Sequence, residues 1–197
     1  MRATTVKGLL RWVAVCAIAL AAGGCGEKGG AAGSSAPAAS SASTEREYSD
    51  EANAYILGRL WAFACVYTIK NKPTEVSKMM IPARAIGNKL GVAILAPPEA
   101  ADALKEMRSP AVSGALTAKK GEKVANLFRL GVVLTDGWYG ASLQGDLTRS
   151  IAEIEHYAKA VGAPENIWKT QLDAAKPTPN APQLLQIAED LEEYYQK

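Results

Sequence analysis

The chain has 197 residues, of which 48% are hydrophobic and 21% are charged, and its formal net charge is +2. Beyond residue 25 the chain has one histidine, His156, and one cysteine, Cys65, which are too few for a His/Cys metal cluster. No Lys/Arg cluster with interleaved aromatic residues supports nucleic-acid binding. No nucleophile-elbow, phosphate-loop or dinucleotide fingerprint occurs. The sequence therefore predicts a protein that is not an enzyme, with no metal, no cofactor and no nucleic-acid partner.

Residues 1–24 predict an export signal. Three basic residues open the segment: Arg2, Lys7 and Arg11. An apolar stretch, Trp12 to Ala22, follows them and leads into small residues before Cys25. The stretch is about 11 residues long, whereas a transmembrane helix needs roughly 20, so the pattern favours a cleaved signal over a membrane span.

The run Ala22-Gly23-Gly24-Cys25 resembles the lipid-attachment site of bacterial lipoproteins. That resemblance implies cleavage before Cys25, acylation of its sulfur and amine, and permanent anchoring, because several acyl chains hold far more firmly than one. The leucine usual three residues before the cysteine is replaced by Ala22, so secretion without lipid is the alternative. With Gly26 after the cysteine, a cell with two membranes would place the protein on the periplasmic face of its outer membrane.

The mature chain divides into a linker and one domain. Residues 25–45 contain the cysteine and a Gly/Ala/Ser/Pro-rich linker, whose composition predicts disorder. Residues 46–197 have the size of a single domain. Without the signal, 19 basic residues face 20 acidic ones, so the mature net charge is −1.

Helix signals recur along the domain, whereas alternating β-branched strand patterns are almost absent. The sequence predicts an all-α bundle of about six or seven helices. Their expected ranges are 46–70, 74–90, 98–108, 117–143, 146–161, 164–174 and 182–196. Pro82 falls inside the second of these helices and predicts a kink.

Two of these helices are apolar on every face, Ala54 to Ile69 and Leu127 to Leu143, and such helices belong at the centre of a bundle. Glycines interrupt both: Gly58 in the first, and Gly131, Gly137 and Gly140 in the second. Because glycine weakens a helix by about 1 kcal/mol relative to alanine, we expect these positions to mark close backbone approach.

The helices also predict an internal duplication. Leu57-Gly58 and Leu130-Gly131 lie in the two apolar helices, and Leu90-Gly91 and Val161-Gly162 end the helices that follow. Similar landmarks thus recur in the same order, which predicts two related three-helix units plus a C-terminal helix. The helices are too long for tetratricopeptide repeats.

Arg59 and Asp136 are charges inside the apolar helices, and a buried charge is costly unless it is paired. Three interpretations remain open: an Arg59–Asp136 ion pair between the helices, a ligand pocket, or exposure of these helix positions at an end of the bundle. Four neighbouring aromatic residues would line that pocket: Trp61, Tyr67, Trp138 and Tyr139. His156 is expected to point into solvent and Cys65 to be an inert core residue.

The leading functional hypothesis is a lipid-anchored envelope protein with a role in protein interaction or assembly, and its expected partner is another envelope protein. The alternative is a helical module that binds a small apolar or amphipathic ligand between the central helices. An enzyme would need a carboxylate mechanism around Asp136, which makes it the third hypothesis.

Overall fold

The domain is built from helices joined by short connections. The computed structural model describes residues 47–108, 110–175 and 180–197, and these ranges contain no strand. Their eight helices are α2 (Asp50–Ile69), α3 (Pro73–Leu90), α4 (Ala100–Met107), α5 (Pro110–Lys120), α6 (Glu122–Ser142), α7 (Thr148–Ala160), α8 (Glu165–Ala175) and α9 (Ala181–Tyr195). The predicted all-α fold is confirmed. The predicted signal, Cys25 and the linker lie outside the described residues.

Local sequence accounts for several helix boundaries. The Ser49 hydroxyl accepts a hydrogen bond from Ala52 N at 3.1 Å and caps α2, and the Asn180 side chain caps α9 in the same way. The single helix expected over 117–143 is wrong, because Gly121, with φ of 90°, separates α5 from α6. Glycine adopts this backbone conformation without a Cβ clash. The bundle consequently has one helix more than the sequence indicated.

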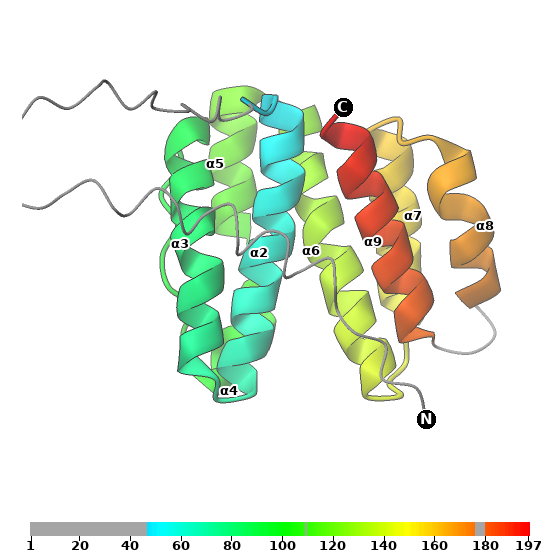
Figure 1. The fold of residues 1–197 in the computed structure, drawn as a ribbon, viewed down its shortest axis with the longest axis horizontal. Coiled ribbons are helices and arrows are strands. Elements are labelled where there is room, and N and C mark those ends of the chain that lie inside the picture. Colours follow the sequence, from blue (N-terminus) through cyan, green and yellow to red (C-terminus); the bar gives the residue numbers. More distant parts are fainter. Residues whose placement is uncertain (1–46, 109, 176–179) are drawn as a thin grey trace, which may run out of the picture. The chain divides into compact units, whose positions relative to one another are not determined.

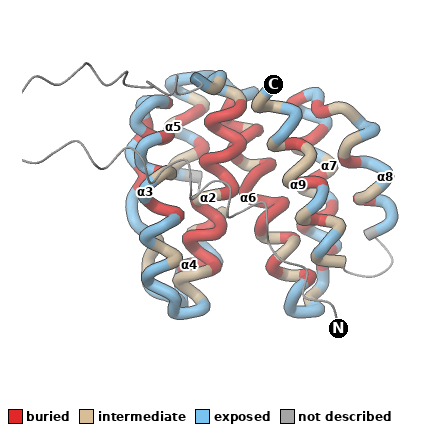
Figure 2. Tube along the Cα trace, in the orientation of Figure 1, coloured by how far each residue is buried: buried red, intermediate tan, exposed pale blue. Residues whose placement is uncertain are grey.

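Helices α2 and α6 form the centre of the domain, and their mutual contact is the most extensive between any two helices in the described ranges. Figure 1 shows them side by side, with α3 and α5 toward one side and α7, α8 and α9 toward the other. Both are buried along most of their length (Figure 2), as expected for helices that are apolar all round. Within the described residues, no helix has the length and apolarity to cross a membrane.

The two central helices run in the same direction and cross at glycine. Ion pairs join their starts, from Lys123 to Glu51 at 2.7 Å, while Phe63 and Trp138 pack edge to face further along, with ring centroids 5.4 Å apart. A Cβ atom on Gly58 would lie 2.1 Å from the backbone oxygen of Phe128. The predicted close approach is therefore confirmed at Gly58.

The crossing is reciprocal. A Cβ atom on Gly131 would lie 2.4 Å from the backbone oxygen of Tyr55. Gly58 and Gly131 are 73 residues apart in the sequence, and so are Tyr55 and Phe128. Gly58 therefore contacts the residue three before Gly131, and Gly131 contacts the residue three before Gly58. Gly137 and Gly140, in contrast, face side chains rather than backbone.

The turns after the central helices also match. Asn71 and Gln144 are the two non-glycine residues with positive φ in the described ranges, at 51° and 56°, and they too are 73 residues apart. In each turn this residue donates its N–H to the carbonyl three residues back, and the next residue donates to the carbonyl five residues back. The helix pairs α2–α3 and α6–α7, the first and second hairpins below, thus share their central crossing and their turns.

The ends of α3 and α7 correspond as well. Gly91 and Gly162 have φ of 74° and 70° and make the same pair of backbone hydrogen bonds with the residues around them. Beyond these glycines the correspondence ends, because α4 packs against α2 whereas α8 packs mainly against α9. The structure thus supports the predicted duplication over two helices of each unit, not three. Helix α3 continues through Pro82.

Candidate functional site

The two buried charges of the central helices do not pair with each other, so the expected Arg59–Asp136 ion pair is wrong. Arg59 forms its ion pair with Glu192 of α9 and also donates a hydrogen bond to the backbone oxygen of Ala188 at 3.3 Å. Asp136 instead accepts from Arg108, the residue that ends α4. The two charges project toward different neighbouring helices, which a pattern along α2 and α6 alone does not indicate.

The predicted aromatic residues fall into two groups. Tyr67 stacks on Phe63, which packs edge to face on Trp138, and the Lys70 ammonium lies 5.1 Å from the ring centroid of Tyr139. Trp61 is buried, at 5% exposure, and makes no ring contact with these residues in the described ranges. The cluster closes the space between the C-terminal halves of α2 and α6, so we interpret it as core packing.

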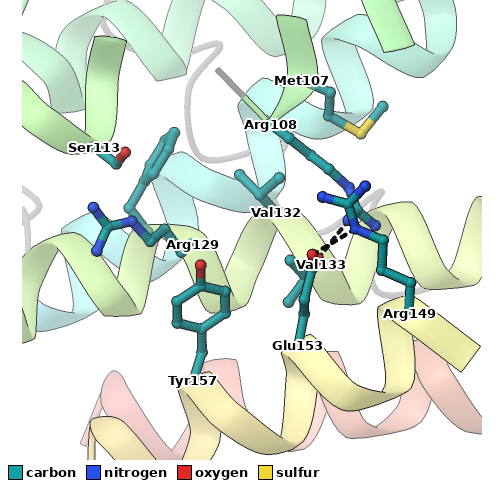
Figure 3. Close-up of a pocket in the computed structure, with 10 residues that line it drawn as sticks. Met107, Arg108, Ser113, Arg129, Val132, Val133, Arg149, Glu153 and Tyr157 are labelled. Atoms are coloured by element: carbon teal, nitrogen blue, oxygen red, sulfur yellow. Dashed lines mark hydrogen bonds and ion pairs between the residues drawn. The ribbon is translucent and has the colours of Figure 1, made fainter. Parts of the chain in front are cut away.

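A pocket of about 280 Å³ opens elsewhere, between α6, α7 and the junction of α4 with α5. Figure 3 shows the residues that surround it. They are Met107, Arg108, Ser113, Phe128, Arg129, Val132, Val133, Arg149, Glu153 and Tyr157, and we call this site the arginine pocket. None of the six residues predicted for a pocket or ion pair lines it, although Asp136 contacts Arg108 from behind.

Helical spacing places the lining residues. Arg149, Glu153 and Tyr157 follow one another at intervals of four residues, and therefore share one face of α7. Val132 and Val133 lie one turn after Arg129, so α6 supplies both an apolar floor and a polar edge. Met107, Phe128, Val132 and Val133 are each at most 4% exposed, so the floor of the pocket is apolar and packed into the core.

Arg108 joins three elements at the base of the pocket. Its guanidinium binds Asp136 on α6 and Glu153 on α7, and donates to the Ser150 hydroxyl at 3.0 Å. Ser150 in turn donates to Asp136 at 3.3 Å. Both carboxylates are mostly buried, with 13% and 26% of their side chains exposed, so Arg108 neutralises charges that would otherwise be costly there.

Arg149 and Arg129 are the other two arginines of the wall. Arg149 donates from Nε to Glu153 at 2.8 Å, and this hydrogen bond raises the pKa of Arg149. Arg129 donates from Nη1 to Glu122 and Asn126 at 2.6 and 2.7 Å, and together with Thr117 it lowers the pKa of Glu122. Arg149 and Glu122 therefore stay charged at neutral pH.

The Tyr157 side chain rises from α7 with its hydroxyl turned toward α6 and into the pocket (Figure 3). In the described part of the chain this hydroxyl makes no hydrogen bond, and the Nη atoms of Arg149 make none either. The pocket thus combines an apolar floor with several unused donors. Such a site is suited to holding a ligand by shape and hydrogen bonding.

The other reactive side chains do not line the pocket. His156 is exposed on the far side of its helix from the apolar stripe, as predicted, and packs edge to face on Tyr157 at 5.0 Å. Cys65 is fully buried, and burial raises the pKa of its thiol to about 12. Among residues 47–108, 110–175 and 180–197, no cluster of three His, Cys, Asp or Glu side chains is arranged to hold a metal ion.

One sequence signal could have pointed to the pocket. Arg129 also interrupts the apolar pattern of α6, seven residues before Asp136, and this spacing puts both charges on one side of the helix. That side must meet polar residues of other helices. Arg108 carries no comparable signal, because it lies at a helix end where a solvated arginine is ordinary.

Comparisons with known proteins give no relative from which to transfer a function: no family model, curated protein or solved structure matches the chain.

Proposed function

We propose that the chain is an exported lipoprotein, anchored through Cys25, whose helical domain binds a small amphipathic ligand in the arginine pocket. The observation that carries the binding role is the pocket itself, which has a buried apolar floor beneath three arginines and a free tyrosine hydroxyl. Its volume of about 280 Å³ falls just below the roughly 300–1,000 Å³ typical of ligand sites. The ligand is therefore small.

The proposed role is binding without catalysis. Both carboxylates near the pocket are held by guanidinium groups: Glu153 by Arg108 and Arg149, and Asp136 by Arg108. Their oxygens are therefore engaged in ion pairs within the protein rather than directed at a ligand. The pocket offers hydrogen bonds and apolar contact, which suffice for recognition.

The anchoring half of the proposal rests on residues 1–25, which carry the signal-like segment and Cys25. In a cell with two membranes we expect the protein on the periplasmic face of the outer membrane. Growth with labelled palmitate, followed by isolation of the full chain, tests this. Label should be incorporated into the natural chain and be lost in Cys25→Ser. Equal labelling of both would contradict lipidation at Cys25.

Native mass spectrometry of residues Gly26–Lys197 tests the binding role. We expect extra mass that is lost on denaturation and that corresponds to a small molecule. Val132→Phe, which fills the pocket floor, should abolish it, whereas Leu104→Phe on the exposed face of α4 should not. A bare monomer would favour the protein-interaction hypothesis instead, and a difference of one subunit would show a homo-oligomer.

A further inference from the structure

The arginine pocket distinguishes sharply between hydrogen-bond donors and acceptors. Its carboxylate acceptors are already used: Glu153 accepts from Arg149 at one oxygen and from Arg108 at the other. Asp136 accepts from both Arg108 and Ser150 behind the wall. A ligand that enters the pocket therefore meets few free acceptors.

Donors, by contrast, remain available. Arg149 uses only Nε in its bond to Glu153, and 78% of its side chain is exposed, so both of its Nη atoms can turn to a ligand. Arg129 uses Nη1 and keeps Nη2 and Nε. The Tyr157 hydroxyl is the third donor, and it lies beside the apolar floor. The complementary ligand group is rich in acceptors.

The charge around the pocket limits that group to a single negative charge. Three arginines line the wall, and three carboxylates contact them: Glu153 in the wall, Asp136 behind it and Glu122 at its edge. Glu122 and Arg149 are 60% and 78% exposed, so solvent screens much of the effect of both charges on the pocket. The charges around the pocket are therefore nearly balanced, and such a site suits a carboxylate better than a doubly charged phosphate.

We infer that the arginine pocket binds a small amphipathic monocarboxylate, whose carboxylate is held by Arg149 and Tyr157 on α7 and whose apolar body lies on Val132 and Phe128. This inference rests on the proposed function, because it names the ligand class of the same site. Guanidinium groups bind carboxylates with short, charge-assisted hydrogen bonds. The buried floor supplies the apolar contact that inorganic or very short anions cannot use.

Isothermal titration calorimetry of Gly26–Lys197, which retains the whole compact unit Tyr48–Lys197, tests the inference. Four probes separate the contributions: octanoate has both charge and apolar body, octanol has only the body, acetate has only the charge, and octylamine has the opposite charge. Octanoate should bind at least tenfold more tightly than any of the other three. Octyl phosphate, the fifth probe, should bind more weakly than octanoate.

Two variants assign the carboxylate contact. Arg149→Gln and Tyr157→Phe should each weaken octanoate binding about fivefold or more and leave octanol binding unchanged. Arg84→Gln, on the exposed face of α3 and outside the pocket, is the matched control and should change neither. Circular dichroism before each titration establishes that the variants are folded.

The outcomes distinguish the two proposals. Equal affinities for octanol and octanoate, or an unchanged octanoate affinity in Arg149→Gln, would overturn the carboxylate assignment but leave small-ligand binding intact. Tighter binding of octyl phosphate would overturn it in favour of a dianion. If none of the probes binds, the inference is overturned. The proposed function is then tested separately by native mass spectrometry, which shows whether a ligand is bound.

Discussion

The first hairpin, α2–α3, and the second, α6–α7, have the same backbone contacts and turns but pack against different helices. They share the glycine crossing, the positive-φ turn residue and the glycine that ends their second helix. They differ in their covering, because α4 lies along α2 whereas α8 lies against α9. The arginine pocket lies on the second hairpin, with the α4–α5 junction as its wall. The part of the fold that the two hairpins share is thus the scaffold, and the candidate site forms where the second hairpin meets the α4–α5 junction.

The largest expected effect comes from substitutions at the glycine crossing of α2 and α6. Gly58→Ala and Gly131→Ala should each destabilise the domain by about 3 kcal/mol or more, because each new Cβ would overlap a backbone oxygen that cannot move aside. Gly114→Ala is the control, since nothing lies within 4 Å of its Cβ. It should stabilise the exposed helix by about 0.5–1 kcal/mol. Urea denaturation measures all three, and a mild effect at only one crossing glycine would contradict the reciprocal packing.

The two hairpins also differ in the partners of their buried charges. Arg59→Met and Arg108→Met should each cost about 3 kcal/mol, because each leaves a partly buried carboxylate without its partner. Double-mutant cycles sharpen the assignment. Arg59 with Glu192, and Arg108 with Asp136, should show coupling of about 1–3 kcal/mol, whereas Arg59 with Asp136 should be additive within about 0.5 kcal/mol. Strong coupling between Arg59 and Asp136 would restore the pair expected from sequence.

Alkaline pH tests a property of α2. Burial raises the pKa of Cys65 from about 9 to about 12, so its contribution to stability is complete below pH 9 and is lost as the pH rises toward 12. The unfolded thiol ionises in that range while the buried thiol does not. Between pH 9 and 10, ionisation of the unfolded thiol should lower the stability by up to about 1.4 kcal/mol, and Cys65→Ala should remove this part of the slope. A slope that is unchanged in the variant would place its origin in other groups.

Above pH 10 the buried tyrosines add to the same trend. Burial raises the pKa of both Tyr55 and Tyr195, so their unfolded forms ionise first. The Cys65→Ala comparison is therefore confined to the range below pH 10, where the tyrosines contribute least relative to the thiol.

The smallest effect compares the two matching turns. Both Asn71 and Gln144 have positive φ, but asparagine tolerates this conformation better than glutamine. Gln144→Gly should therefore stabilise the domain by about 1 kcal/mol, and Asn71→Gly by less than about 0.5 kcal/mol. Thermal unfolding of both variants measures the difference. Equal gains at the two turns would mean that the residue type does not matter there.

The sequence by itself determined the helical class, the central position of α2 and α6, the glycine crossing and the order of the repeated landmarks. Each follows from local propensity or from apolar residues on all faces of a helix, and both properties can be identified from the sequence. The exposed position of His156 and the burial of Cys65 follow in the same way from their places on a helix.

Only the tertiary structure decided which charges meet and where a pocket forms. Arg59 reaches α9 and Asp136 receives Arg108 because contacts of this kind depend on the rotation and packing of separate helices. Neither quantity is encoded in the spacing along one helix. The arginine pocket likewise combines residues of four helices and one helix end, so its convergence is visible only once these elements are assembled.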